Sequence, residues 1–331
     1  MSQTARQPAS GSNRGVIELD GAARPLLSRR GFVARLILRE LMLLDAGDRI
    51  PGVDGLAHQH GVGFGTVQQA IELIEEAGAA TLTRRGAQGT FLDQLDWKTA
   101  WAVAGLPNIM GSLPLPYTKR YEGLATALFE LLARHGTPGM LSYMRGAARR
   151  LEAVVDGHAD FAVTSVFAAE HFRRSTSDAV SIVVSLPVQT FVSEHSLIFA
   201  EPRRKALRAG DRVGVDRDSL DQMLITEMEI EQVAGEVTMV DMPYGHILDA
   251  LAQHEIDVAV WNSEEVGASQ FAIQPLHSHA ARQLQGAHTR AAIVARADDL
   301  LTCRALTRSF DVSEIVSIQG EVLAGQRQAR Y

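Results

Sequence analysis

The chain has 331 residues, of which 46% are hydrophobic and 21% charged, and its formal net charge is −7. At roughly 150 residues per domain this length predicts two domains, and the composition excludes a chain that is disordered throughout. No apolar run approaches the roughly 20 residues of a membrane span. The single cysteine, Cys303, excludes a disulfide framework and a thiolate metal cluster, so we expect a reducing cytoplasm.

The negative charge is unevenly distributed. Residues 1–92 contain 10 Lys and Arg against 9 Asp and Glu, a balance of +1, whereas the remainder contains 22 against 30, a balance of −8. The net charge therefore excludes a protein that binds polyanions over its whole surface. It leaves open local DNA binding by the N-terminal part, because electrostatic attraction depends on the face that is presented. Residues 1–24 are polar, lack the apolar segment of a secretory signal and are expected to form a flexible tail.

Residues 25–93 have the pattern of a small domain made of three helices and a hairpin. Ser28 is a typical N-cap, and the turn residues from Asp45 end the first helix. In the third helix, the helical spacing of Val67, Ala70, Ile71 and Ile74 predicts that these side chains form a buried stripe. The expected helices are Ser28–Ala46, Val53–His60 and Gly65–Gly78, and the expected strands are Ala80–Thr83 and Thr90–Leu92, joined by a hairpin loop at 84–89.

These residues resemble the winged helix-turn-helix of GntR-type transcription regulators over about 45 positions. The resemblance rests on the spacing of Arg49-Ile50-Pro51, Leu56-Ala57, Gly61-Val62, Thr66 to Ala70, Leu73 to Gly78, and Arg84 to Phe91. It implies that Gly61 allows the left-handed turn and that the third helix enters the major groove of double-stranded DNA. The implied DNA-binding residues are Phe64, Gly65, Thr66, Gln68 and Gln69 on this helix, and Arg84, Arg85, Gln88 and Gly89 in the wing.

The chain departs from the usual pattern of those regulators. They carry an arginine where this chain has Asp54, the pattern Ser-Arg-x-Thr where it has residues 63–66, and an arginine pair where it has Gln68 and Gln69. Each missing arginine removes a phosphate contact or a guanine contact, although glutamine can still bind adenine. We expect DNA binding to be weaker or more narrowly conditioned. A winged helix that binds protein instead of DNA remains an alternative.

After a linker at 94–106, residues 107–331 alternate strand-like and helix-like segments. This alternation predicts an α/β domain with mostly parallel sheets, in two runs at about 109–186 and 212–295. The expected strands are Ile109–Leu115, Met140–Met144, Asp160–Thr164, Val180–Leu186, Leu197–Ala200, Arg212–Val215, Val237–Asp241, Asp257–Trp261 and Ala291–Ala295. The expected helices include Arg120–His135, Ala147–Gly157, Ser219–Ile230 and Gly245–His254.

The segment from Ile109 to Ala125 resembles the start of a periplasmic-binding-protein-like, type-2 ligand domain. The stretches 156–165 and 254–262 resemble corresponding strand ends of its two lobes. With the winged helix in front, the chain is similar to the YhfZ family from about Arg29 onward. Ligands of open α/β sheets bind beyond the carboxyl ends of strands. The implied ligand-binding residues are Tyr117, Thr118, Lys119, Arg120, Arg145, Ser165, Tyr244, Trp261 and Asn262.

Some of these residues have a simpler interpretation beside the functional one. Ser165 could only cap the following helix, and Trp261 fits the core better than a contact. Lys119 and Arg120 could be ordinary surface charges, but cations are unfavourable where a helix begins. Their position therefore favours an anionic ligand.

Catalytic and metal-binding motifs are not found in the sequence. His277, His279 and His288 have no cysteine or carboxylate at ligand spacing, and no nucleophile or phosphate-loop motif occurs. We predict no metal, no cofactor and no enzyme. The sequence predicts a cytoplasmic, homodimeric transcription regulator that binds a DNA operator and a small polar or anionic effector, without a membrane partner. The alternative is a cytosolic small-molecule binding protein or enzyme whose winged helix does not bind DNA.

Overall fold

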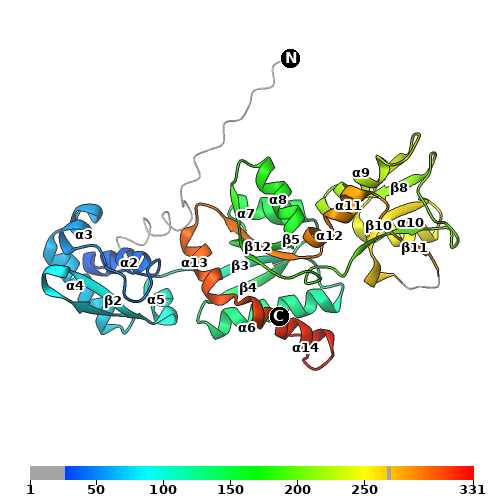
Figure 1. The fold of residues 1–331 in the computed structure, drawn as a ribbon. Helices are drawn as coiled ribbons and strands as arrows, with labels where there is room; N and C mark the ends of the chain where they lie inside the picture. The colour runs from blue at the N-terminus through cyan, green and yellow to red at the C-terminus, as the bar shows by residue number, and fades with distance from the viewer. Residues whose placement is uncertain (1–26, 267–269) are drawn as a thin grey trace, which may run out of the picture. The chain divides into compact units, whose positions relative to one another are not determined.

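The computed structural model describes residues 27–266 and 270–331, so the predicted tail at 1–24 lies outside the described residues. The chain divides into two compact units. The first extends to Asn108 and includes His135–Thr137 and Asp298–Ala305; the second comprises Ile109–Arg134, Pro138–Ala297 and Leu306–Tyr331. The predicted fold class is confirmed, because a helix-turn-helix with a two-stranded wing precedes a two-lobed α/β unit (Figure 1).

The first unit forms from the amphipathic segments that the sequence predicts. Its helices are α2 (Arg29–Leu41), α3 (Val53–His60), α4 (Phe64–Glu76) and α5 (Trp97–Val103), and its strands are β1 (Ala80–Arg84) and β2 (Thr90–Leu95). Ser28 caps α2 by accepting from the backbone N–H of Gly31, and Gly61 ends α3 with φ +62°. The predicted stripe on α4 is buried. α3 and α4 are therefore fixed as a helix-turn-helix pair.

Helix α5 occupies most of the segment that the sequence predicts as a linker. Asp96 caps the helix, and both Trp97 and Trp101 are buried. The indole N–H of Trp97 donates to Thr137, and that of Trp101 donates to the carbonyl oxygen of Pro107. The helix forms here because the two indoles, four residues apart, share one face and can be buried together.

The first lobe of the second unit is built on a five-stranded sheet with the order β4-β3-β5-β12-β6. β3 pairs in parallel with β4 and β5, whereas β12 is antiparallel to both β5 and β6. The strands are β3 (Ile109–Leu113), β4 (Gly139–Tyr143), β5 (Phe161–Ser165), β6 (Val180–Ser185) and β12 (Ala291–Arg296). The helices are α6 (Lys119–Arg134), α7 (Ala147–Val155), α8 (Val166–Ser175) and α14 (Val312–Leu323), together with the end of α13 (Leu300–Ser309), whose residues up to Ala305 belong to the first unit.

The second lobe has a five-stranded sheet with the order β11-β7-β10-β8-β9. β8 pairs in parallel with β9 and β10, while β7 is antiparallel to β10 and β11. The strands are β7 (His195–Phe199), β8 (Arg212–Val215), β9 (Thr238–Asp241), β10 (Val258–Asn262) and β11 (Ala272–Pro275). The helical segments are α9 (Leu220–Ile230), η3 (Tyr244–His246), α10 (Ile247–Ala252), η4 (Ser263–Glu265), α11 (His279–Gln283) and α12 (Gln285–His288).

The predicted division into two consecutive, mostly parallel runs is wrong in two respects. The strand predicted at Ala291–Ala295, at the end of the second run, belongs to the first sheet, and neither sheet is mostly parallel. The strand predicted at Leu197–Ala200, outside both runs, belongs to the second sheet. Both sheets are mixed, because the chain passes to the second lobe after β6 and returns before β12. The first strand after each crossing, β7 in the second lobe and β12 in the first, pairs antiparallel with its neighbour in the sheet. None of the described helices is long and apolar enough to span a membrane.

Candidate nucleic-acid interface and ligand cleft

The exposed face of α4 is neutral at its N-terminal end. Phe64 is 60% exposed, Gly65, Gln68 and Gln69 are exposed, and Thr66 is half-buried. Glu72 and Glu76 follow on the C-terminal half, and the helix sequence contains neither lysine nor arginine. The structure thus places all five predicted residues of this helix at its N-terminal end, although no cation lies among them.

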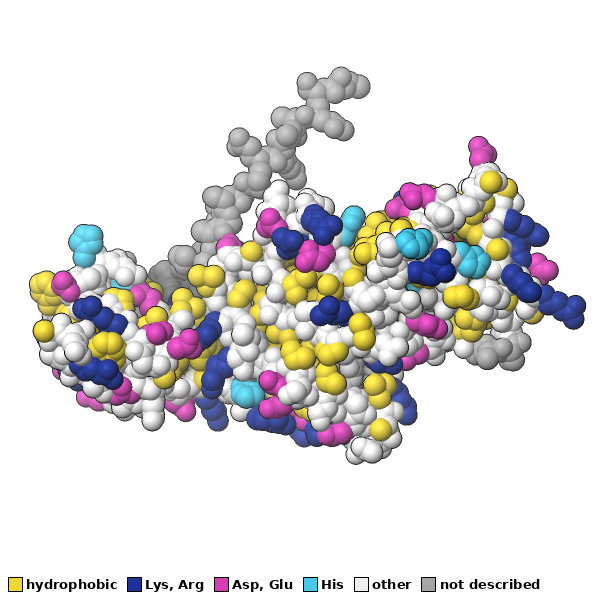
Figure 2. Space-filling view, in the orientation of Figure 1, with side chains coloured by type: hydrophobic (Ala, Val, Ile, Leu, Met, Phe, Trp, Pro, Cys, Tyr) yellow, Lys and Arg dark blue, Asp and Glu magenta, His cyan; other side chains and the backbone are white. Residues whose placement is uncertain are grey.

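The wing supplies positive charge beside α4. Arg84 forms an ion pair of 3.0 Å with Glu75 of α4, which neutralises part of the acidic half of the helix. The guanidinium of Arg85 lies over the Phe91 ring at 4.5 Å and stays exposed. Gln88 is exposed and Gly89 half-buried in the loop between β1 and β2. Lys and Arg side chains are visible on the surface of this unit in dark blue (Figure 2).

Two further arginines, which are not among the predicted DNA-binding residues, belong to this surface. Arg49 pairs with Phe91 in an isolated antiparallel bridge, and a Cβ on Gly89 would lie 2.6 Å from its Nε. Arg29 donates to the carbonyl oxygen of Gly61, at the turn between α3 and α4. Arg49 is part of the helix-turn-helix motif in the sequence. Its position beside the wing becomes visible only in the structure, where residues 47–50 pair with β2.

A cleft separates the two lobes of the second unit. Its inner part, about 670 Å³ with open solvent included, is lined by residues of both lobes, among them Arg150, His195 and Asp221. Its outer part is lined by Lys119, Arg120, Trp261 and Glu264, among others. The two parts share Tyr117, Arg145 and Tyr244, so they adjoin each other, and their size suits a small molecule.

Seven of the nine predicted ligand-binding residues line this cleft. They are Tyr117, Thr118, Lys119, Arg120, Arg145, Tyr244 and Trp261. Ser165 is buried behind it, where it caps α8 and donates from Oγ to Asp221. Asn262 is buried and accepts from the backbone N–H of Glu264. Both of these residues have structural hydrogen bonds in place of a position on the cleft wall.

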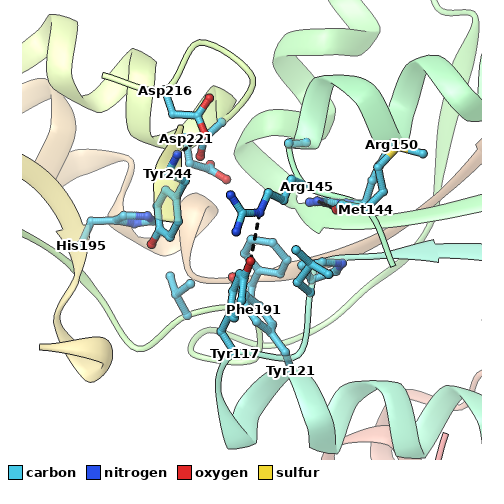
Figure 3. Close-up of a pocket in the computed structure, with 16 residues that line it drawn as sticks. Tyr117, Tyr121, Met144, Arg145, Arg150, Phe191, His195, Asp216, Asp221 and Tyr244 are labelled. Atoms are coloured by element: carbon cyan, nitrogen blue, oxygen red, sulfur yellow. Dashed lines mark hydrogen bonds between the residues drawn. The ribbon is translucent and has the colours of Figure 1, made fainter. Parts of the chain in front are cut away.

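Arg120 and Arg145 have different surroundings. The Arg120 guanidinium pairs with both carboxylate oxygens of Glu264 across the lobes and also donates to the carbonyl oxygen of Gln189. Arg145 donates from Nε to the Tyr117 hydroxyl at 3.0 Å, and Figure 3 shows its guanidinium inside the cleft. Arg145 pairs with no carboxylate in the described part of the chain. Its charge is therefore available to a ligand, whereas that of Arg120 is already compensated.

A buried polar cluster lies at the inner end of the cleft, and among its members the sequence predicts only Ser165 as a site residue. Asp221 of α9 accepts from Ser165 of β5 at 2.6 Å, which links the two lobes. Burial raises the pKa of Asp221 to about 7, against the opposing effects of the Ser165 bond and the Arg150 charge. Burial likewise lowers the pKa of Arg150 to about 10, although this guanidinium donates to the carbonyl oxygens of Val163 and Met144. No spacing in the sequence marks these residues, because their proximity arises only when the lobes meet.

Two histidines meet where the chain crosses between the lobes. The Nδ1 atoms of His195 and His288 are 3.0 Å apart, and both rings are buried. Burial lowers the pKa of His195 to about 3, with a further contribution from His288, whose own pKa burial lowers to about 4. Both rings are therefore neutral near pH 7. His288 is one of the three histidines weighed above as metal ligands, with His277 and His279. The described residues contain no group of three side chains that could hold a metal ion.

An aromatic pair forms part of the cleft wall. The ring of Tyr244 stacks on that of Trp261 with centroids 3.5 Å apart and planes 16° apart. Trp261 is buried in the core of the second lobe while its edge reaches the outer cleft. The backbone N–H of Tyr244 donates to the carboxylate of Asp216, and this hydrogen bond helps to hold Tyr244 in place.

Comparison with known proteins gives matches over most of the chain. A family model described as "YhfZ C-terminal domain" matches residues 96–331, and one described as "Helix-turn-helix domain" matches residues 45–92. The sequence is 30% identical to the uncharacterized protein YhfZ of Escherichia coli strain K12 over 311 residues, 93% of this chain and 99% of that protein.

Solved structures also match. The crystal structure of YhfZ from Shigella flexneri is 29% identical, covers 71% of this chain and 97% of its own, and has a TM-score of 0.57. An amino acid ABC transporter substrate-binding protein from Streptococcus pneumoniae, bound to L-arginine, is 13% identical, covers 66% of this chain and 96% of its own, and has a TM-score of 0.45.

Proposed function

Because the chain belongs to the YhfZ family and carries a helix-turn-helix domain before the C-terminal domain of that family, we propose that it is a DNA-binding transcription regulator controlled by a small molecule. The observation that carries the proposal is the presence of both parts in one chain. A fold alone does not specify function, so the two surfaces described above supply the chemistry. The protein acts in the cytoplasm, where its operator DNA is found.

The first surface supports DNA binding by position and charge. In a helix-turn-helix the second helix enters the major groove, and cations at its edges bind phosphates. Here Arg29 lies at the turn before α4, while Arg49 and Arg85 lie at the wing. The phosphate contacts thus come from around the helix and not from the helix itself.

The second surface supports an effector with an anionic group. Arg145 has an exposed guanidinium in the cleft, and Lys119 lines the outer part at the start of α6. A carboxylate or phosphate would form charge-assisted bonds there, which are about twice as strong as neutral ones. To switch the protein, the ligand has to favour one arrangement of the lobes, which requires contacts with both. Tyr244 supplies the contact with the second lobe.

A second candidate function has one observation in its favour. Glu72 and Glu76 give the C-terminal half of α4 an acidic surface, which suits a winged helix that contacts a basic protein. The chain would then be a small-molecule binding protein with no affinity for DNA. Salt-dependent binding separates the two functions, because DNA affinity falls steeply with salt when phosphates are neutralised.

The test of DNA binding uses fluorescence anisotropy of a labelled random-sequence 30-base-pair duplex at 50, 100 and 200 mM KCl. We expect binding that weakens by at least about tenfold over this range, as two or more phosphate contacts require. Absence of binding at 50 mM KCl would contradict the DNA-binding function and favour the second candidate.

The test of the effector site is a thermal-shift screen of carboxylated and phosphorylated metabolites. We expect an anionic compound to raise the melting temperature of the wild type and to lose this effect in Arg145→Ala. Arg203→Ala, which removes an exposed arginine from the second lobe, is the matched control and should respond like the wild type. A neutral compound that stabilises all three proteins equally would contradict an anionic effector.

A further inference from the structure

We propose that α4 recognises A·T base pairs, with Gln68 and Gln69 bonded to adenine and Phe64 packed against thymine methyl groups. This inference rests on the proposed DNA-binding function and adds the class of sequence that the helix recognises. Glutamine is the side chain that binds the N6 and N7 atoms of adenine in the major groove, and apolar side chains contact the C5 methyl group of thymine.

The three side chains lie on the exposed side of α4. Phe64 and Gln68 are four residues apart, so they are neighbours on the helix surface. Gln69 lies about 100° around the helix from Gln68, and Gly65 is a neighbour of both glutamines. All three are exposed, and the opposite face is fixed in the core by Val67 and Ile71. They occupy the first two turns, which is the part of a recognition helix that contacts base edges.

The charges of α4 argue against recognition of guanine. Guanine is read chiefly by arginine or lysine, and α4 has neither. The arginines of this surface lie at the turn and the wing: Arg29 contacts Gly61, and Arg85 covers Phe91. From those positions they can neutralise phosphates, which places the helix without selecting bases. Base selection is left to the neutral side chains.

Gly65 supplies an independent indication of a close external partner. It is the second residue of α4, and glycine is a poorer helix former than alanine, by up to roughly 1 kcal/mol in a helix interior. A Cβ built on Gly65 meets no atom within 4 Å, and Gly65 does not have a positive φ. The protein's own packing therefore does not require glycine at position 65. Absence of a side chain beside Gln68 and Gln69 would let the helix backbone approach the groove closely.

The test begins with a duplex enriched from a random library by the full-length protein. Single adenines in the enriched site are replaced by 7-deazaadenine, which lacks the N7 acceptor, and single thymines by uracil, which lacks the methyl group. We expect at least one 7-deazaadenine to weaken binding about fivefold or more, the lower end of what a bidentate contact gives. 7-Deazaguanine should leave binding within twofold.

Matched variants assign these effects to residues. In Gln68→Ala or Gln69→Ala the sensitive 7-deazaadenine should no longer weaken binding, because the contact is already lost. In Phe64→Ala the same should hold for uracil. Gln326→Ala, an exposed glutamine of the other unit, is the control and should keep both sensitivities.

Gly65→Ala tests the close approach separately from folding. We expect it to melt at the same temperature as the wild type or higher and to bind the enriched duplex at least about fivefold more weakly. Gly320→Ala, another exposed helical glycine with open space around it, should have the same effect on melting and none on DNA binding.

The outcomes distinguish this inference from the function on which it rests. Salt-sensitive binding that ignores 7-deazaadenine and uracil, or that is lost with 7-deazaguanine, overturns the recognition of A·T pairs and leaves the DNA-binding function intact. Absence of any salt-sensitive binding overturns both.

Discussion

Asp221 combines a buried carboxyl group with a position at the meeting of two lobes. Its raised pKa has a direct consequence for stability. The unfolded chain releases this proton near the ordinary pKa of 3.8, whereas the folded protein keeps it until about pH 7. The stability that Asp221 contributes is therefore fully present below about pH 4 and is lost as the pH rises toward 7.

Asp221→Asn should remove this loss, because asparagine does not ionise. We expect the free energy of unfolding of the variant, relative to the wild type, to rise by roughly 2–3 kcal/mol between pH 5 and pH 8. Urea unfolding at the two pH values measures this difference. Asp249→Asn, on the surface of α10, is the control and should show no such change. Parallel pH profiles of Asp221→Asn and the wild type would contradict the assigned pKa.

At the residue scale, the sequence predicts positions better than partners. It predicts correctly that Tyr117, Arg145 and Tyr244 follow strand ends, and these residues meet in the cleft. It does not predict that Arg120 finds Glu264, because 144 residues separate them in the chain. The buried Asp221 also escapes prediction, since burial of a carboxyl group depends on a lobe contact that no local pattern encodes.

At the scale of elements, the wing and α4 form one charged surface. Arg84 is held by Glu75, which leaves Arg85 as the exposed wing arginine without an acidic partner among the described residues. We expect Arg85→Ala to weaken binding to different duplexes by a similar factor and to lower the slope of log affinity against log salt by about 1.

The matched comparison for Arg85→Ala is Arg84→Ala, which also removes one wing charge. It frees Glu75 as well, so its loss of affinity should equal or exceed that of Arg85→Ala. Anisotropy at three salt concentrations measures both slopes. A wild-type slope in Arg85→Ala would show that the wing does not touch phosphates.

Several element boundaries follow closely from local patterns, but sheet membership does not. The first helix, predicted to extend to Ala46, ends at Leu41. Val53–His60 and Arg212–Val215 are predicted to the residue, since turn residues and apolar runs delimit them. The sequence does not indicate the lobe to which β12 belongs, because an apolar strand fits a central position in either sheet equally well. Nor does it predict β11, because the four residues of this strand, which include Pro275, give too short a pattern.

At the scale of the whole molecule, we expect a homodimer. One helix-turn-helix covers one half-site, and a two-fold operator presents two half-sites about 34 Å apart along the DNA. Light scattering during size-exclusion chromatography, at micromolar concentration with and without the enriched duplex, should give twice the mass of one chain. A single-chain mass under both conditions would contradict this expectation.

The position of β12 also determines when the first lobe can fold. β6 pairs only with β12 in the described sheet, yet the ribosome makes β12 more than 100 residues later, after the entire second lobe. During synthesis, β5 and β6 therefore have unpaired edges, which are open to aggregation until the chain returns. A nascent chain stopped at residue 290 should retain the second lobe as its only complete sheet in this unit. The lobe that is made first is completed last.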